Sequence, residues 1–164
     1  MTWDRLRQQL QKSYSQQDVE LVRRAYELAE RAHADQKRKS GEPYIIHPLA
    51  VAGILAELRL DAQTVAAALL HDVAEDTSIQ IPDLAEEFGA EVASLVDGVT
   101  KLVEISQLAN LPADSRDPNI ESLRKMFLAM YSDVRVVLIK LADRLHNMRT
   151  MGYMSPEKQR RISR

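Results

Sequence analysis

The chain contains no cysteine among its 164 residues, which excludes disulfide bridges, thiolate metal ligands and a cysteine nucleophile. It also contains no apolar run near the roughly 18 residues that cross a membrane, and its amino terminus lacks the apolar core of a signal peptide. We therefore expect a cytoplasmic protein with no membrane partner.

An excess of charge of either sign is also missing. Lys and Arg together number 22 and Asp and Glu 24, which gives a formal net charge of −2. Proteins that bind nucleic acid through their overall charge carry a clear basic excess. We therefore expect no direct nucleic-acid partner, and the length predicts one compact domain.

Strand signals are missing as well, because β-branched runs with period-two alternation do not occur. Apolar residues recur instead at helical spacing, and the few Gly and Pro stand between these segments. The sequence predicts an all-α fold, with Asp61 capping one helix and Gly89 ending another. The main helices are expected at about 17–36, 48–59, 61–76, 91–102 and 133–150. Residues 106–119 read as a loop, either a lid or a solvated connector.

The stretch 66–76 passes from a wholly apolar helix into four ionisable residues out of six. On one continuous helix, His71 and Glu75 share a face, and Asp72 and Asp76 share another about 100° away. Three acids beside an apolar run need a cation or a protonated partner. Carboxylates with a neutral imidazole suit a divalent metal. The alternative is a solvated, acidic helix end.

A basic turn, Gln36 to Pro43, precedes His47 and Pro48. Its Lys and Arg residues, with a hydroxyl and a Gly, form either an anion-binding loop or a solvated turn. Pro48 favours the first turn of a new helix, so His47 is expected at a helix start. His33 continues an apolar stripe and is interpreted as a packed residue.

The helix over 133–150 carries two apolar stripes, which predicts that it is buried on most sides. The second stripe turns polar at Asp143. A carboxylate leaving a buried helix needs a partner. Lys140 or Arg144 could supply a salt bridge, whereas an acidic, histidine-bearing cleft nearby favours a metal ligand. Asn147 and Thr150 follow on the same face.

The ordered set His47, His71-Asp72 and Asp143 on a helical scaffold resembles the HD superfamily of metal-dependent phosphohydrolases. The resemblance extends to longer stretches, which look like the hydrolase domain of the bacterial RelA/SpoT homologue (Rel) family. These stretches are residues 38–48, 71–77, 96–102, 139–150 and 156–163. They cover nearly the whole chain.

This resemblance implies a manganese-dependent (Mn²⁺) enzyme that removes the 3′-pyrophosphate of guanosine tetra- and pentaphosphate, the alarmones of the stringent response, leaving GDP or GTP. It implies metal ligands at His47, His71, Asp72 and Asp143, and a catalytic acidic pair at Glu75 and Asp76. The implied substrate contacts are Arg38, Lys39, Ser40, Asn147 and Thr150, with Lys140 and Arg144 as possible phosphate contacts or partners of the ligands.

Long members of the Rel family continue into a synthetase domain and ribosome-linked regulatory domains. We therefore expect residues 1–164 to be an HD-type hydrolase domain, an N-terminal fragment of a longer bifunctional enzyme. Three alternatives stay open: an HD phosphohydrolase of another nucleotide, a module that binds alarmone without turnover, and a structural helical domain.

Overall fold

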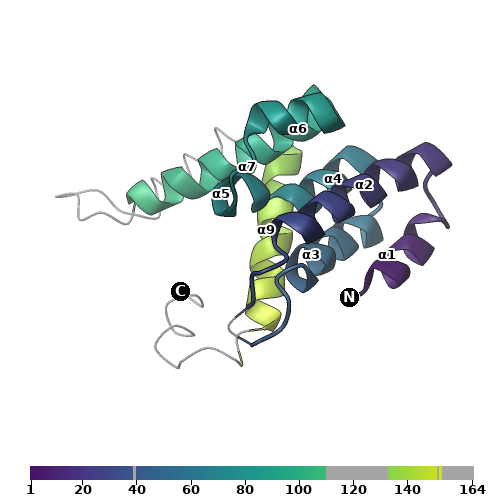
Figure 1. Cartoon of the computed structure of the whole chain (residues 1–164), viewed down its shortest axis with the longest axis horizontal. Coiled ribbons are helices and arrows are strands. Elements are labelled where there is room, and N and C mark those ends of the chain that lie inside the picture. The colour runs from purple at the N-terminus through teal and green to yellow at the C-terminus, as the bar shows by residue number, and fades with distance from the viewer. Residues whose placement is uncertain (39, 110–132, 151, 153–164) are drawn as a thin grey trace.

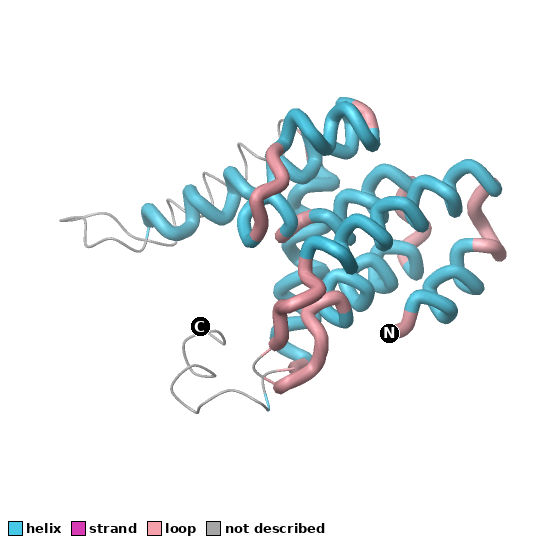
Figure 2. Tube along the Cα trace, in the orientation of Figure 1, coloured by secondary structure: helices cyan, strands magenta, loops and turns pink. Residues whose placement is uncertain are grey.

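The computed structural model describes residues 1–38, 40–109, 133–150 and 152, with the backbone alone for 103–109. These residues form helices and no strand, with one isolated bridge between Lys37 and Pro43 (Figure 2). The helices are α1 (Trp3–Leu10), α2 (Gln16–Ala32), α3 (Ile46–Glu57), α4 (Ala62–Leu70), α5 (Val73–Asp76), α6 (Ile81–Phe88), α7 (Ala90–Ala109) and α9 (Val134–Arg149). The predicted all-α fold is confirmed.

Helix α4 forms the centre of the fold and contacts α2, α3, α7 and α9 (Figure 1). Its residues 65–70 are completely buried. Alanines at 66–68 keep this helix thin, so its neighbours can approach closely. Each buried leucine, Leu69 and Leu70, contributes about 1.5–3 kcal/mol of burial free energy. The apolar run that leads into His71 is therefore the core itself.

Side chains and backbone conformation define the helix ends. Asp61 caps α4 by accepting a hydrogen bond from the Thr64 amide at 2.9 Å. Gly89 ends α6 with φ +90°, a conformation that L side chains rarely adopt. Both ends were predicted from the sequence and are confirmed. Asp133 caps α9 in the same way, by accepting from the Arg135 amide.

Helices α7 and α9 meet at Gly98. A Cβ atom added there would stand 2.7 Å from Cγ2 of Val136, so a side chain at this position would force Val136 to move. The sequence predicted a bend or a close contact at Gly98, and the structure has the close contact. The absence of a side chain at Gly98 lets α7 and α9 approach closely at this position.

Two predicted helix boundaries differ from the structure. Helix α7 continues to Ala109, so residues 106–109 of the predicted loop are helical, and 110–119 lie outside the described residues. Helix α2 ends at Ala32, four residues earlier than predicted.

Helix α9 is not buried on most sides, contrary to the prediction. Four residues of its first apolar stripe are exposed, namely Val134, Leu141, Leu145 and Met148. The face that packs inward carries Val136, Ile139 and Asp143. The Gly98 contact and the buried Asp143 decide which face turns inward, and apolar periodicity alone contains neither.

Candidate metal centre

Three buried side chains from three separate elements converge beside the carboxyl end of α4. His47 lies in the first turn of α3, His71 directly follows α4, and Asp143 lies midway along α9. One ligand atom from each lies within 4.8 Å of the others. Their exposed fractions are 3%, 1% and 6%. Two imidazoles and a carboxylate at this separation have the chemistry of a divalent metal site.

The helix that bears His71 differs from the prediction. A single helix through Asp76 was expected, but α4 ends at Leu70 and α5 begins at Val73. Asp72 has φ −97° and ψ −8°, which interrupts the helical hydrogen-bond pattern between them. The single continuous helix is therefore wrong, but Asp72 and Asp76 still share a face, since the Asp76 amide donates to the Asp72 carbonyl at 2.9 Å and the Tyr44 hydroxyl reaches both carboxylates.

The hydrogen bonds of His71 test whether the site suits a cation. Its Nδ1 lies 2.7 Å from the carbonyl oxygen of Ala68. A carbonyl only accepts, so Nδ1 carries the proton. The buried Nε2 has no hydrogen-bond partner, yet it stands 3.1 Å from Oδ1 of Asp72. In a neutral imidazole the Nε2 lone pair would face this carboxylate, so the pair needs a cation. That cation is either a second proton on Nε2 or a bound metal, and the residues fit a metal.

Asp72 lies beside this group and contacts both histidines. Its Oδ2 lies 3.8 Å from Nε2 of His47 and accepts a 2.6 Å hydrogen bond from the Tyr44 hydroxyl. Burial alone would raise the pKa of Asp72, but the charge of His71 and the Tyr44 hydroxyl outweigh it and lower the pKa below its usual range. Asp72 is therefore ionised at neutral pH.

Asp143 has three polar partners. Its Oδ1 lies 3.1 Å from Nε2 of His47 and accepts from Nδ2 of Asn147 at 2.6 Å, and its Oδ2 is 2.6 Å from Nζ of Lys140. Burial opposes its ionisation, but His47, when its ring is protonated, and the charges of Lys140 and His71 lower the pKa of Asp143. The salt bridge with Lys140 and the approach to His47 occur together, so the two sequence interpretations of Asp143 are compatible. Arg144 is exposed on α9.

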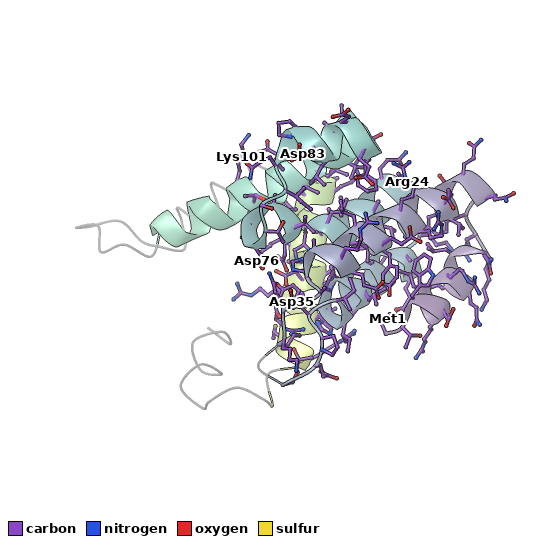
Figure 3. The ribbon with its side chains drawn as sticks, viewed as in Figure 1. Met1, Arg24, Asp35, Asp76, Asp83 and Lys101 are labelled. Atoms are coloured by element: carbon purple, nitrogen blue, oxygen red, sulfur yellow. The ribbon has the colours of Figure 1, made fainter. Side chains whose placement is uncertain are left out.

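The acidic pair lies on α5, at the edge of the buried group. Burial, followed by the charge of Asp72, raises the pKa of Glu75, and the charge of Lys140 opposes this shift. Asp76, labelled in Figure 3, accepts a 3.3 Å hydrogen bond from the Tyr44 hydroxyl. Both side chains are exposed. They can therefore exchange protons with a molecule bound beside the histidines.

The basic turn folds back toward α9. The bridge between Lys37 and Pro43 closes it, and Gly41 turns the chain with φ +86°. Arg38 donates from Nη2 to Oδ1 of Asn147 at 2.9 Å, and its Nη1 lies 3.2 Å from Nδ1 of His146. The structure thus brings Arg38 to the edge of the site.

Two predicted substrate contacts that the structure describes, Ser40 and Thr150, form hydrogen bonds outside this cluster. The Ser40 hydroxyl donates to Oε2 of Glu42 at 3.0 Å. The Thr150 hydroxyl donates to the backbone oxygen of His146 at 3.0 Å, at the carboxyl end of α9. Lys39 lies outside the described residues.

Sequence reasoning missed two residues of the site, Tyr44 and His146. The Tyr44 hydroxyl contacts Asp72 and Asp76. Nδ1 of His146 lies 2.8 Å from Nδ1 of His47, and burial, with the charges of His47 and Arg38, lowers its pKa to about 4. The sequence contained a signal for each, since Tyr44 stands three residues before His47, and His146 follows Asp143 by one turn of the same helix. His33, predicted to be packed, is buried.

The fold and the site together define an all-α protein with a buried histidine–carboxylate centre. A family model described as the HD domain matches residues 25–164. The chain belongs to the HD domain family. None of the helices described here is long and apolar enough to span a membrane.

Curated relatives are similar over nearly the whole chain. The guanosine-3′,5′-bis(diphosphate) 3′-pyrophosphohydrolase of Vibrio cholerae is 51% identical over 99% of this chain and 22% of its own length. The bifunctional (p)ppGpp synthase/hydrolase SpoT of Escherichia coli is 49% identical, with the same coverage of both. The GTP pyrophosphokinase of Myxococcus xanthus is 52% identical over 89% of this chain and 19% of its own. The chain thus spans about a fifth of these relatives.

A solved structure is similar as well. It is described as a metazoan ortholog of SpoT that hydrolyses ppGpp, and it matches with a TM-score of 0.62 at 28% identity. The match covers 86% of this chain and 78% of that one. Together with the curated relatives, it confirms the resemblance to the RelA/SpoT family that the motifs indicated.

Proposed function

We propose that residues 1–164 form an HD-type hydrolase domain that removes pyrophosphate from the 3′ position of guanosine tetra- or pentaphosphate, leaving GDP or GTP. One observation carries this proposal: the orphaned Nε2 of His71 lies in a buried group of metal-binding chemistry. The chain that contains this group is 51% identical, over 99% of its length, to a relative named for this reaction.

The ligands of the proposed site are His47, His71, Asp72 and Asp143, and the ion we propose is Mn²⁺. Imidazole and carboxylate donors suit Mn²⁺ and other divalent ions of similar hardness. When bound, the ion supplies the lowered pKa of an attacking water and the polarisation of a phosphoryl oxygen. The low pKa of Asp72 and of Asp143 keeps both carboxylates ready to bind at neutral pH.

The acidic pair has the proton-transfer role in this proposal. Water attacks the phosphorus bonded to O3′, the P–O3′ bond breaks, and the proton that water loses is balanced by the one that O3′ gains. The raised pKa of Glu75 makes its carboxylate a stronger base for the proton of water. Asp76, joined to Asp72 through the Tyr44 hydroxyl, is placed to hold the water or to protonate O3′.

The cations around the site have the substrate-binding role. A nucleotide with several phosphates needs positive charge and donors near it. The proposed contacts are Arg38, Lys39, Ser40, Lys140, Arg144, Asn147 and Thr150. The contacts of Arg38 with Asn147 and of Lys140 with Asp143 support this for two of the cations, since both charges lie at the ligand cluster.

The test is pyrophosphate release from guanosine tetraphosphate, with Mn²⁺ and with a chelator. Asp72→Ala is the site variant, and Asp83→Ala, on α6, is the control. We expect Mn²⁺-dependent release that Asp72→Ala abolishes and Asp83→Ala keeps. Tight nucleotide binding without release would favour a sensing module, and release from other nucleotides at equal rates would favour a general HD phosphohydrolase. Fragment origin, ribosome-linked partners and cytoplasmic location stay predictions.

A further inference from the structure

Arg38 contacts two neighbouring residues of α9 through the two ends of its guanidinium group. Its Nη1 lies 3.2 Å from Nδ1 of His146, and its Nη2 lies 2.9 Å from Oδ1 of Asn147. A guanidinium group stays charged and has only donors. Both partner atoms must therefore be acceptors, which leaves Nδ1 of His146 without a proton and fixes the orientation of the Asn147 amide.

The position of the proton between His146 and His47 follows from this. Because Nδ1 of His146 accepts, it carries no proton. Nδ1 of His47 lies only 2.8 Å from it, a distance at which one of the two nitrogens must donate. His47 is thus the donor and holds its proton on Nδ1. In the neutral ring, the lone pair is then on Nε2, which lies 3.1 Å from Oδ1 of Asp143.

Asn147 links the same arginine to a second proposed metal ligand, Asp143. Its Oδ1 accepts from Arg38, so its Nδ2 is free to donate to Oδ1 of Asp143 at 2.6 Å. The fork of Arg38 therefore orients two α9 side chains, and each of these contacts one proposed metal ligand. In metal sites, partners of this kind fix the tautomer and the direction of the ligand ring.

His71 gives an internal comparison. Its Nδ1 proton is held by the backbone oxygen of Ala68, so its tautomer is built into the main chain of α4. The tautomer of His47 depends instead on a side chain. Resting on the metal site proposed above, we propose that His146 is a positioning residue that keeps the proton of His47 on Nδ1 and thereby presents Nε2 to a divalent cation.

Four substitutions separate this role from simple packing. His146→Asn keeps an acceptor oxygen close to the position of Nδ1. His146→Gln moves the acceptor toward the position of Nε2, and His146→Leu removes it. Arg38→Met leaves His146 in place but removes the donor that forces it to accept. The tautomer of His47 is read in the metal-free protein from two-bond proton–nitrogen correlations, and Mn²⁺ affinity is measured by titration calorimetry.

We expect Nδ1 of His47 to be protonated in the wild type and in His146→Asn, with similar Mn²⁺ affinity. In His146→Leu and His146→Gln we expect the proton to move to Nε2, facing Asp143, and Mn²⁺ affinity to fall about 10–100-fold. Arg38→Met should give a mixture of the two tautomers.

The inference is overturned by a wild-type His47 protonated on Nε2, or by a His146→Gln protein with the wild-type tautomer and affinity. If the wild type binds no Mn²⁺, the proposed function fails instead. The tautomer measurement needs no metal, so it still decides the role of His146.

Discussion

The hydroxyl of Tyr44 donates a 2.6 Å hydrogen bond to Oδ2 of Asp72. The same hydroxyl lies 3.3 Å from Oδ2 of Asp76, and the ring packs against His33 at 4.6 Å between centroids. Tyr44 thus joins a proposed metal ligand to a proposed catalytic acid. Burial, with the charge of Asp72, raises the pKa of Tyr44, so the phenol stays protonated and remains a donor.

Removing this hydroxyl should weaken the site without unfolding the protein. A hydrogen bond to a charged group contributes about 1.5–3 kcal/mol, so Tyr44→Phe should lower Mn²⁺ affinity roughly 10–100-fold. The matched control is Tyr26→Phe, which also loses a hydroxyl–carboxylate contact, to Glu30, on the exposed part of α2. Calorimetric titration of both variants checks this. An equal loss of Mn²⁺ affinity in the two variants would show that the Tyr44 hydrogen bond has no special role.

Glu75→Gln should lower the rate of pyrophosphate release about 10²–10⁴-fold, the usual contribution of a general base. Mn²⁺ affinity should stay near that of the wild type, because Glu75 is not a proposed ligand. Glu30→Gln, away from the site, should change neither quantity. A Glu75→Gln protein that releases pyrophosphate at the wild-type rate would remove Glu75 from the mechanism.

The pH dependence of release should also report on Glu75. A base acts in its deprotonated form, and burial with the charge of Asp72 raises the pKa of Glu75. The acid limb of the rate profile should therefore lie above the ordinary range of a glutamate, and activity should rise with pH through it. In Glu75→Gln this limb should disappear, whereas a limb that persists unchanged must belong to another group.

Mn²⁺ binding should compete with protons. Although burial opposes it, the charges of Asp72 and Asp143 raise the pKa of His71, and a metal can bind Nε2 only after its proton has left. Affinity should therefore fall as pH is lowered through this pKa, by about tenfold per pH unit for each proton released. Titrations in two buffers of different ionisation enthalpy count these protons. Identical heats in both buffers would mean that none is released.

The contact between Gly98 and Val136 should appear as an energetic coupling. Gly98→Ala improves helix propensity by about 1 kcal/mol, but its Cβ would stand 2.7 Å from Val136, and overpacking costs about 1–3 kcal/mol. We expect little gain or a net loss of stability in the wild type. In a Val136→Ala background the clashing methyl group is absent, so Gly98→Ala should stabilise the protein. Denaturant unfolding of the four proteins gives the coupling, and additive values would refute it.

The sequence was sufficient to predict features with a local chemical cause. The cap at Asp61, the helix end at Gly89 and the start of α3 near Pro48 depend only on adjacent residues. The grouping of His47, His71 and Asp143 followed from matching the spacing of known motifs, and the structure brings these side chains together.

Which face of a helix turns toward the core could not be predicted from adjacent residues. Leu141 and Leu145 belong to a stripe as apolar as a core face, yet both are exposed because Gly98 and Asp143 orient the opposite face inward. His146 was missed for a related reason. Its importance comes from Arg38 and His47, which are distant in sequence and meet it only in the folded chain.

The proposed ligands come from α3, the end of α4 and α9, which are separate stretches of chain held together by packing. An ion bound here would act as a removable cross-link in a protein whose sequence has no cysteine to form a permanent one. It would bind the native state and not the unfolded chain, adding about 2.7 kcal/mol of stability at a concentration one hundred times its dissociation constant. Metal supply would then set the stability of the folded domain as well as its chemistry.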